Sequence, residues 1–349
     1  MAFEMHWILE WIFDLRGKIN MMNKTTNEVL LQVENLQVSF FTPKGEVKAV
    51  NDIHYTLHYN EIMGIVGESG SGKTVEAFTL MGLLAPNGKI KEGRALFEGR
   101  DLLKFSEKEY INFRGKEAGI IFQNPMTSLN PVYTIGKQLK EVLFLHNKKI
   151  QKSEAEARVL DMLRQVGINQ PEKRMKQYPH ELSGGMRQRI MIAMGIINHP
   201  KLLIADEPTT ALDVTIQAQI LDLIRNIQKK TGMAVIFITH NLGVVAEICD
   251  KVTVMYAGHI VEQGKVRDVF YYTRHPYTRG LLESMPSLLT DTKEPLAMIQ
   301  GSPVNLLELP EGCPFADRCK HCMEKCKRQK PPQTQFEEGH IAYCWLNHR

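Results

Sequence analysis

Apolar and polar residues alternate from Val29 to Phe41, which predicts a β-strand at a sheet edge or one arm of a hairpin. A turn signal from Pro43 to Gly45 ends this run, and a second strand-like stretch continues through Tyr59. The first regular part of the chain is therefore expected to be a β-rich subdomain.

Short apolar runs and longer helical patterns alternate after this segment. The apolar runs predict buried strands, and they cover Ile62–Gly67, Gly119–Phe122, Leu202–Ala205, Val235–Thr239 and Val252–Tyr256. Helical patterns cover Val75–Leu84, Ile135–Arg164 and Ile216–Lys230. Strands interleaved with helices indicate an α/β fold with a parallel core, and a helical subdomain is expected between about Pro131 and Pro200.

The two ends of the chain differ from this core. Near the N-terminus, apolar residues recur at helical spacing: Phe3, Trp7, Ile8, Trp11, Ile12 and Leu15. This pattern is typical of an amphipathic helix, at a membrane interface or packed on its own domain, unless the true start is Met21 or Met22. From Gly301 onward proline, cysteine and basic residues become frequent. We therefore expect an N-terminal extension over 1–28, a large domain over 29–285 and a small C-terminal lobe over 286–349.

Composition and charge exclude some classes of protein. The 43 basic and 39 acidic side chains give a formal net charge of +4, which is too even to imply a nucleic-acid partner by itself. No apolar run approaches the ~20 residues of a membrane-spanning helix, so a membrane role must come through a partner. The N-terminus lacks the basic start and unbroken apolar stretch of a secretory signal.

The most specific motif is Gly67-Glu-Ser-Gly-Ser-Gly-Lys-Thr74, which lies between a predicted strand and a predicted helix, as a P-loop requires. Its glycines let backbone N–H groups point at phosphate oxygens, and the positive end of the next helix adds to the attraction. Lys73 suits the β- and γ-phosphates, and the Thr74 hydroxyl suits Mg²⁺. An incidental glycine-rich turn would not fill every fixed position. The predicted nucleotide ligands are Gly67, Ser69, Gly70, Ser71, Gly72, Lys73 and Thr74.

Two adjacent carboxylates end the apolar run that starts at Leu202. Asp206 suits the shell of a magnesium ion, and Glu207 suits a general base that polarises an attacking water. Such a pair alone is often structural, but downstream of a P-loop it indicates phosphate-ester hydrolysis.

A third motif, Leu182-Ser-Gly-Gly-Met186, opens a predicted helix. Ser183, Gly184 and Gly185 there would form a second phosphate-binding helix N-terminus. A chain with one P-loop has no obvious need for a second cradle, unless that cradle completes the site of a neighbouring molecule.

With these motifs in this order, the chain resembles the ABC ATPase family, whose signature matches residues 182–186. The resemblance implies a head-to-tail dimer that holds two ATP between one subunit's P-loop and the other's signature. It also implies further nucleotide contacts: Gln123 as the Q-loop glutamine near Mg²⁺ and γ-phosphate, Ala211-Leu-Asp213 as the D-loop, and His240 as the switch histidine. Phe40 matches the adenine-stacking aromatic, with Phe41 and Tyr55 as competitors.

Longer stretches narrow the resemblance to the oligopeptide/dipeptide importer ATPases. They are residues 123–131, 209–220 and 275–282, together with Cys313-Pro-Phe-Ala-Asp-Arg-Cys319. This resemblance covers nearly everything after Val29. It implies import of peptides, or of nickel or a metal chelate, together with a homologous second ATPase, two membrane permeases and an external binding protein. It also implies a peripheral position at the cytoplasmic face of the membrane.

The C-terminal lobe concentrates the cysteines. Cys313, Cys319, Cys326 and Cys344 provide four thiols, a set that suits either an iron–sulfur cluster or tetrahedral zinc. The resemblance implies a [4Fe–4S] cluster; zinc is the alternative, and a cytosolic redox poise disfavours disulfides. Cys322 departs from the family pattern and keeps a local zinc knuckle open. Because the lobe lies outside the ATP motifs, we expect its loss to damage stability or assembly more than ATP binding.

These expectations combine into an ATP-hydrolysing subunit of a peptide importer. One rival is an ABC protein that acts on ribosomes or DNA, but such proteins usually carry two cassettes or a long coiled-coil insertion. Another rival is a nucleic-acid-binding zinc module in the basic C-terminal lobe, whose lysines are more simply explained as a solvated face.

Overall fold

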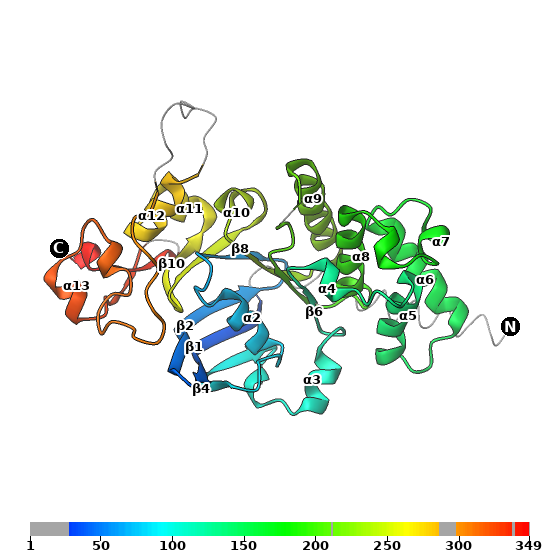
Figure 1. The fold of residues 1–349 in the computed structure, drawn as a ribbon, viewed down its shortest axis with the longest axis horizontal. Coiled ribbons are helices and arrows are strands. Elements are labelled where there is room, and N and C mark those ends of the chain that lie inside the picture. Colours follow the sequence, from blue (N-terminus) through cyan, green and yellow to red (C-terminus); the bar gives the residue numbers. More distant parts are fainter. Residues whose placement is uncertain (1–27, 211, 286–297, 337–338, 349) are drawn as a thin grey trace. The chain divides into compact units, whose positions relative to one another are not determined.

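The computed structural model describes residues 28–210, 212–285, 298–336 and 339–348 (Figure 1). They fall into two units that interleave along the chain. The first unit contains residues 28–30, Leu57–Glu61 and Ser106–Ile236, and the second contains Leu31–Thr56, Ile62–Phe105 and the chain from Phe237 onward. The amphipathic pattern expected before residue 20 lies outside the described residues.

An antiparallel sheet in the second unit has the strand order β2–β1–β4–β5. Its strands are β1 (Val29–Thr42), β2 (Gly45–His58), β4 (Gly88–Phe97) and β5 (Arg100–Asp101). The expected hairpin arm is confirmed, but the edge position is wrong, because β1 pairs with β4 on its other side. β4 escaped the sequence analysis because its first seven residues are mostly charged or glycine, and none of these seven is buried.

The P-loop strand β3 (Ile62–Val66) belongs to another sheet of the second unit, with the order β11–β12–β10–β9–β3. All five β3 residues are buried, as the apolar run predicts, and β3 pairs in parallel with β9 (Lys251–Tyr256). Antiparallel pairing then adds β10 (His259–Lys265), β12 (Ile341–Tyr343) and β11 (Gln333–Gln335). The C-terminal segment therefore extends the P-loop sheet and is not merely appended to it.

Helices cover this second unit. They are α2 (Lys73–Leu80), α10 (Leu242–Ile248), α11 (Val266–Tyr271), α12 (Pro276–Glu283) and α13 (Glu324–Arg328), with short 3₁₀ turns η1 (Leu102–Lys104), η3 (Ala316–Arg318) and η5 (Trp345–His348). α10 packs on β3, whereas α11 and α12 pack on β10 (Figure 1). The described helices include none with the length and apolar character needed to cross a membrane.

The first unit holds the parallel strands β6 (Ala118–Ile121) and β7 (Leu202–Asp206), and β8 (Ala234–Thr239) follows β7 and continues into the second unit. Its helices are α3 (Glu107–Phe113), α4 (Pro125–Ser128), α5 (Ile135–His146), α6 (Lys152–Gln165), α7 (Pro171–Arg174), α8 (Gly184–Ile196) and α9 (Val214–Thr231), with the turn η2 (Pro179–Glu181). α5, α6 and α8 pack on one another in the region where a helical insertion is expected.

The long helical pattern from Ile135 to Arg164 is two helices, α5 and α6. Asn147 ends α5, and its side-chain oxygen accepts a hydrogen bond from the backbone N–H of Lys149 at 3.2 Å. An Asn side chain that satisfies a nearby backbone group in this way competes with helix continuation. Hydrophobic periodicity does not detect such a break.

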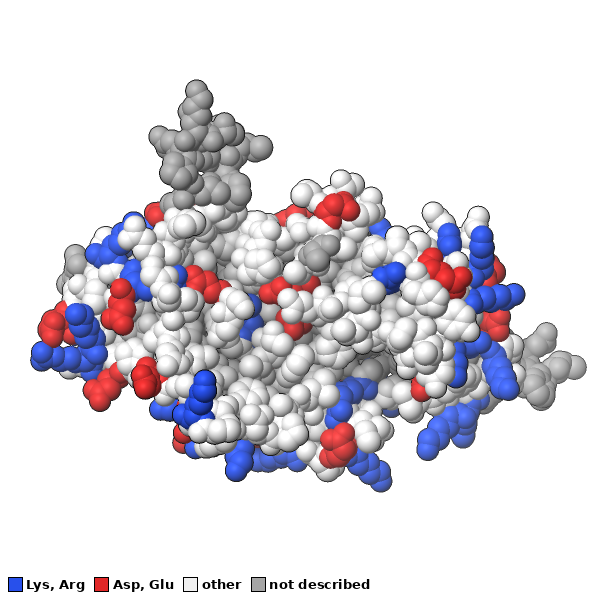
Figure 2. Space-filling view, in the orientation of Figure 1, with Lys and Arg blue, Asp and Glu red and all other residues white. Residues whose placement is uncertain are grey.

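Charged side chains of both signs spread over the face that Figure 2 shows. This distribution agrees with the nearly equal numbers of basic and acidic residues, 43 and 39.

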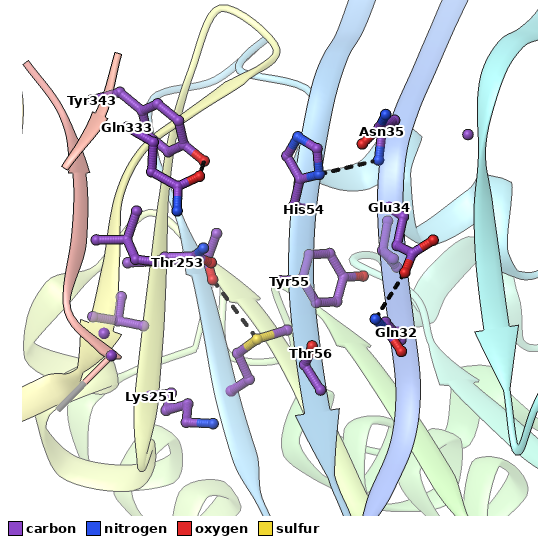
Figure 3. A pocket seen from close by; sticks show the side chains of 18 of the residues that line it. Gln32, Glu34, Asn35, His54, Tyr55, Thr56, Lys251, Thr253, Gln333 and Tyr343 are labelled. Atoms are coloured by element: carbon purple, nitrogen blue, oxygen red, sulfur yellow. Dashed lines mark hydrogen bonds between the residues drawn. The ribbon is translucent and has the colours of Figure 1, made fainter. Parts of the chain in front are cut away.

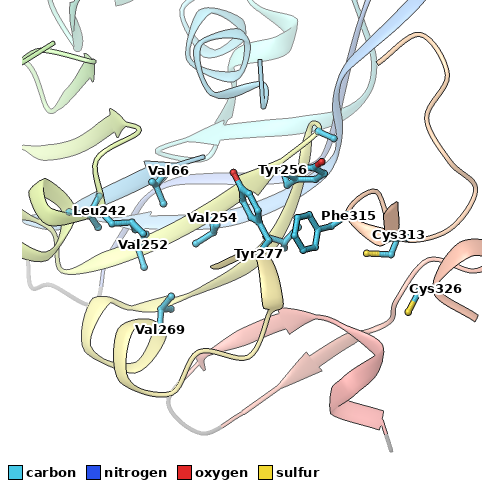
Figure 4. Close-up of a cluster of buried hydrophobic side chains, with 14 residues drawn as sticks. Val66, Leu242, Val252, Val254, Tyr256, Val269, Tyr277, Cys313, Phe315 and Cys326 are labelled. Carbon is cyan, nitrogen blue, oxygen red and sulfur yellow. The ribbon is translucent and has the colours of Figure 1, made fainter. Parts of the chain in front are cut away.

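Aromatic residues connect the P-loop sheet to the C-terminal segment in one buried cluster (Figure 4). Val66 and Val254 of the sheet share this cluster with Tyr256, Tyr277 and Phe315. The Tyr256 and Phe315 rings meet edge to face with centroids 5.3 Å apart, an arrangement that the ring quadrupoles favour.

His275, which begins α12, gives this cluster a pH dependence. It is 2 % exposed, its Nδ1 accepts the backbone N–H of Tyr277 at 3.1 Å, and burial lowers its pKa from 6.5 to about 3. The unfolded chain therefore binds an extra proton below pH 6.5. We expect His275 to reduce the free energy of unfolding by up to about 1.4 kcal/mol for each pH unit below that value.

The variant His275→Asn isolates this effect, because Asn retains an N-cap acceptor but does not titrate. Urea unfolding at pH 7.5 and at pH 5.5 measures the difference. The wild type should lose more stability on acidification than the variant; equal losses would show that His275 does not contribute.

Candidate nucleotide-binding site

The P-loop connects β3 to α2 through a tightly curled backbone. Gly72 has φ 100°, and a Cβ atom on it would lie 2.5 Å from the carbonyl oxygen of Ala49. A Cβ atom on Gly67 would lie 2.1 Å from the carbonyl oxygen of Met255. Only glycine fits at these two positions. The curled loop therefore accounts for the glycines at positions 67 and 72 of the motif.

Lys73 places its ammonium group inside this loop. Its Nζ donates to the carbonyl oxygens of Gly67 at 2.7 Å and Glu68 at 2.9 Å, and to Ser71 Oγ at 3.3 Å. Lys73 and Ser71 are buried, whereas Ser69, Gly70 and Thr74 are exposed. The loop thus offers exposed amides and a hydroxyl outside a buried positive charge, an arrangement suited to an anion.

The three aromatic candidates for adenine stacking differ in their surroundings. Tyr55 is 5 % exposed, and its hydroxyl donates to the Glu76 carboxylate, so its ring is not available for stacking. Burial and the nearby Glu76 raise the pKa of Tyr55 well above 10.0. Phe41 is 41 % exposed, with the ammonium groups of Lys89 and Lys91 near its ring. Phe40 is half-buried beside Gly88, and its role stays a prediction.

Tyr55 also lines a separate pocket of about 800 Å³ in the second unit (Figure 3). Its lining contains none of the residues that the sequence analysis predicts for the nucleotide site. Several lining groups bond to one another: Gln32 Nε2 donates to Glu34 at 2.8 Å, and Tyr343 donates to Gln333 at 3.2 Å. This pocket is not the predicted nucleotide site.

The adjacent carboxylates Asp206 and Glu207 lie in the first unit, at the end of β7. Asp206 is 3 % exposed, and Glu207 leaves the strand with φ 47°, a conformation uncommon for a residue with a side chain. Glu207 Oε2 accepts hydrogen bonds from Gln123 Nε2 at 2.9 Å and from Thr210 Oγ1 at 2.8 Å. The structure therefore brings Gln123 and Glu207 together, as expected for parts of one site.

Thr210 is a site residue that the sequence analysis missed. Its hydroxyl fixes the same carboxylate oxygen that Gln123 contacts. A hydroxyl residue three positions after the carboxylate, in the turn that follows the strand, was the available signal.

The signature residues lie at the exposed N-terminus of α8. Ser183 is the N-cap, and its Oγ accepts the Met186 N–H at 3.4 Å. Ser183 and Gly184 are exposed, and a Cβ atom on Gly184 would meet no heavy atom within 4 Å. The N-terminal amides of this 13-residue helix are therefore open to an anion from another molecule.

The D-loop residue Asp213 caps the neighbouring helix. Its Oδ1 accepts the N–H of Ile216 at 2.9 Å, and Asp213 itself is exposed. Gly185 lies close to Ile216, since a Cβ atom on it would be 3.2 Å from Ile216 Cγ2. The N-termini of α8 and α9 thus lie side by side; Ala211 is outside the described residues.

His240 follows β8 and is exposed at the end of that strand. It belongs to the second unit, with the P-loop and Phe40. The first unit holds the other predicted site residues: Gln123, Ser183, Gly184, Gly185, Asp206, Glu207 and Asp213.

The cysteines of the C-terminal lobe are free thiols, so no disulfide is present among them. Burial and, to a smaller extent, the neighbouring thiols of Cys344, Cys326 and Cys319 raise the pKa of Cys313 to about 12. However, the described part of the chain contains no group of three or more His, Cys, Asp or Glu side chains that could hold a metal ion. Burial favours the neutral thiol over the thiolate that a metal needs. The metal-binding lobe expected from the spacing is therefore not established.

Residues 50–210 match the family described as ABC transporter, and residues 261–326 match the oligopeptide/dipeptide transporter C-terminal region. The oligopeptide transport ATP-binding protein OppD of Salmonella typhimurium is 55% identical over 91% of this chain and 93% of its own length. The dipeptide transport ATP-binding protein DppD of Bacillus subtilis is 52% identical over 91% of this chain and 95% of its own.

A solved structure of a dimeric ATP-binding cassette in a post-hydrolysis state, bound to ADP and Pi, is similar with a TM-score of 0.62. At 23% identity, covering 68% of this chain and 99% of that one, it shows the cassette's α/β fold. Together with the relatives that match over nearly the whole chain, these findings show that the chain belongs to the ABC transporter family, among the oligopeptide and dipeptide transport ATP-binding proteins.

Proposed function

We propose that this chain binds and hydrolyses ATP to drive the uptake of dipeptides or oligopeptides through partner permeases. The observation that carries the catalytic part is the carboxylate of Glu207, which Gln123 and Thr210 hold after the buried strand β7. A carboxylate fixed in this way suits a general base for water attack on a phosphate.

In the proposed hydrolysis of ATP, each predicted site residue has its own role. The P-loop amides and Lys73 bind the phosphates of ATP, and Phe40 stacks on the adenine. Glu207 accepts a proton from the water that attacks the γ-phosphorus, as the bond to the leaving ADP oxygen breaks. Lys73, Gln123 and His240 stabilise the charge that develops on the γ-phosphate oxygens.

Magnesium fits the oxygen donors of this site. Thr74 provides a hydroxyl, Asp206 a carboxylate and Gln123 an amide oxygen, which are the hard ligands that Mg²⁺ prefers. A site completed by ATP phosphates and water needs only one or two protein carboxylates. When bound, the ion would neutralise charge on the β- and γ-phosphates.

A second ATPase completes each site in this proposal. Ser183 and Gly184 are exposed at a helix N-terminus, and Gly185 beside them is half-buried. These three residues would bind the γ-phosphate held by the partner's P-loop. Asp213 lies beside them at the same exposed surface. We infer a heterodimer with a homologous ATPase, attached to two permeases at the cytoplasmic face of the membrane and served by an external binding protein.

The class of the transported solute can be identified with the assembled transporter in lipid vesicles. Binding protein loaded with a dipeptide or an oligopeptide should stimulate ATP hydrolysis several-fold over unloaded binding protein. The nickel or metal-chelate alternative expects stimulation by the metal and none by peptide. That second outcome would reject peptides as the transported class.

For the C-terminal lobe we propose a [4Fe–4S] cluster held by Cys313, Cys319, Cys326 and Cys344. These four sulfurs are the donor set that such a cluster uses, and electrostatic interactions link Cys313 to the other three. Zinc is the alternative, with Cys322 as a further ligand, since Cys322 interacts with Cys326.

Anaerobic purification tests the cluster. The protein should be brown, with equal amounts of iron and acid-labile sulfide, and replacing any one of the four cysteines with Ser should remove the colour. Cys322→Ser is the matched control in the same lobe and should keep the colour. A colourless protein with one zinc per chain, lost in Cys322→Ser, would establish the zinc alternative instead.

A further inference from the structure

Glu68, the second residue of the P-loop, forms an ion pair with an arginine of the C-terminal lobe. Arg318 NH1 lies 2.7 Å from Glu68 Oε2, and Arg318 NH2 lies 3.0 Å from Glu68 Oε1. These are two parallel charge-assisted hydrogen bonds, which fix the direction of both side chains as well as joining them. Both residues belong to the second unit.

The other donors of Arg318 are also occupied. NH1 donates to the Tyr256 hydroxyl at 3.3 Å, NH2 donates to the carbonyl of Ile299 at 3.3 Å, and Nε donates to the carbonyl of Gln300 at 3.0 Å. The Arg318 side chain is only 6 % exposed, whereas that of Glu68 is 26 % exposed. A buried arginine with every N–H group engaged has little freedom to take another position.

Tyr277 of α12, the helix that precedes the lobe, holds the backbone of Glu68. The Glu68 N–H donates to the Tyr277 hydroxyl at 2.9 Å, and the Tyr277 ring packs on Phe315, with centroids 5.3 Å apart (Figure 4). Phe315 directly precedes η3, the turn that ends at Arg318. The short segment between Cys313 and Cys319 thus binds the Glu68 carboxylate directly through Arg318, and it supports the partner of the Glu68 amide through the packing of Phe315 on Tyr277.

This contact reaches the group that binds phosphate. The carbonyl of Glu68 accepts a hydrogen bond from Lys73 Nζ at 2.9 Å. Glu68 therefore connects the C-terminal lobe to the P-loop lysine through a single residue.

We propose that Arg318 is a positioning residue for nucleotide binding, which holds Glu68 so that the P-loop keeps its phosphate-binding conformation. This inference rests on the proposed nucleotide site. A loop that holds its binding conformation for only part of the time binds ligand more weakly in proportion to that fraction. The lobe therefore sets the affinity for ATP, in addition to any role in stability or assembly.

Changes in KM and kcat distinguish two roles of Arg318: positioning the P-loop for nucleotide binding, or only attaching the C-terminal lobe to the rest of the second unit. In the assembled transporter, Arg318→Ala should raise the KM for ATP by about tenfold, the order expected when one charge-assisted bond is lost. The kcat at saturating ATP should change much less, because bound nucleotide itself selects the competent loop. Arg318→Lys keeps the charge but not the fork-shaped contact, so it should restore only part of the affinity.

Arg328→Ala is the matched control. Arg328 lies in the same lobe and forms an ion pair with Glu324 at 2.8 Å, in which both side chains are exposed. Loss of the Arg328 side chain should therefore leave the KM for ATP unchanged. Tyr277→Phe removes only the partner of the Glu68 amide and should raise the KM in the same direction by a smaller factor. Glu68→Gln combined with Arg318→Ala should be no worse than Arg318→Ala alone, because both changes break one interaction.

Measuring nucleotide binding by the Lys73→Ala variant tests the proposed nucleotide site separately from the positioning role of Arg318. If Lys73→Ala abolishes binding while Arg318→Ala behaves like Arg328→Ala, the positioning role is wrong and the nucleotide site stands. If Lys73→Ala binds nucleotide normally, the proposed site itself fails. A fall in thermal stability of Arg318→Ala with an unchanged KM would assign the pair to attachment of the lobe alone.

Discussion

Glu207→Gln should leave Mg-ATP binding intact while reducing steady-state hydrolysis by roughly 10²–10⁴-fold, the usual contribution of a general base. The amide has nearly the shape of the carboxylate but does not accept the proton of the attacking water. The P-loop and Lys73 are unchanged in this variant, so bound ATP should accumulate in a closed dimer with the partner ATPase. Single-turnover hydrolysis and gel filtration with Mg-ATP measure these two effects.

Glu172→Gln serves as the control for this experiment. Glu172 is a largely exposed carboxylate of the first unit, paired with Arg164 on the surface, and its loss should not affect turnover. Near-normal hydrolysis by Glu207→Gln would reject Glu207 as the base.

The second large effect is expected at the partner's nucleotide. Ser183→Arg places a bulky side chain at the open N-terminus of α8, where Ser183 and Gly184 are exposed. It should reduce hydrolysis at the partner's P-loop by roughly 10²-fold, comparable to the loss of one anion-stabilising donor at an active site. Turnover is measured in a heterodimer whose own Lys73 site is already disabled, so that only the partner's site is observed.

Ser153→Arg is a suitable comparison, since Ser153 is an exposed serine on α6 of the same unit. That variant should hydrolyse ATP like the parent heterodimer. If Ser183→Arg causes no further loss either, the head-to-tail arrangement of the two ATPases is wrong.

The buried strands were predictable because their signal is local. The runs at Ile62, Gly119, Leu202, Val235 and Val252 are almost entirely apolar, and each forms a strand whose start lies within one residue of the predicted one. Ser183 could likewise be placed at a helix start, since it is an N-cap whose side-chain oxygen accepts a backbone N–H.

Features that depend on distant pairing were not predictable. The first seven residues of β4 are mostly charged or glycine and none is buried, so its pairing with β1 and β5, and not its hydrophobic pattern, makes it a strand. The short strand β12 pairs with the edge of β10, and β11 pairs in turn with β12. Neither relation appears in the hydrophobic pattern of the segment itself.

The same reason explains what was missed at the site. Glu68 and Arg318 are separated by 250 residues, and no spacing rule connects them. The sequence analysis accordingly placed the C-terminal lobe outside the ATP motifs, whereas the structure joins the lobe to the P-loop through this pair.

The most direct test of the proposed function measures ATP hydrolysis and the uptake of a labelled oligopeptide in the same proteoliposomes, which contain the complete transporter with its binding protein. We expect uptake only with Mg-ATP, in proportion to the ATP hydrolysed, and loss of both activities in Lys73→Ala. Oligopeptide uptake that persists in Lys73→Ala, or hydrolysis that proceeds without any peptide entering the vesicles, would contradict the proposal that this chain drives peptide import.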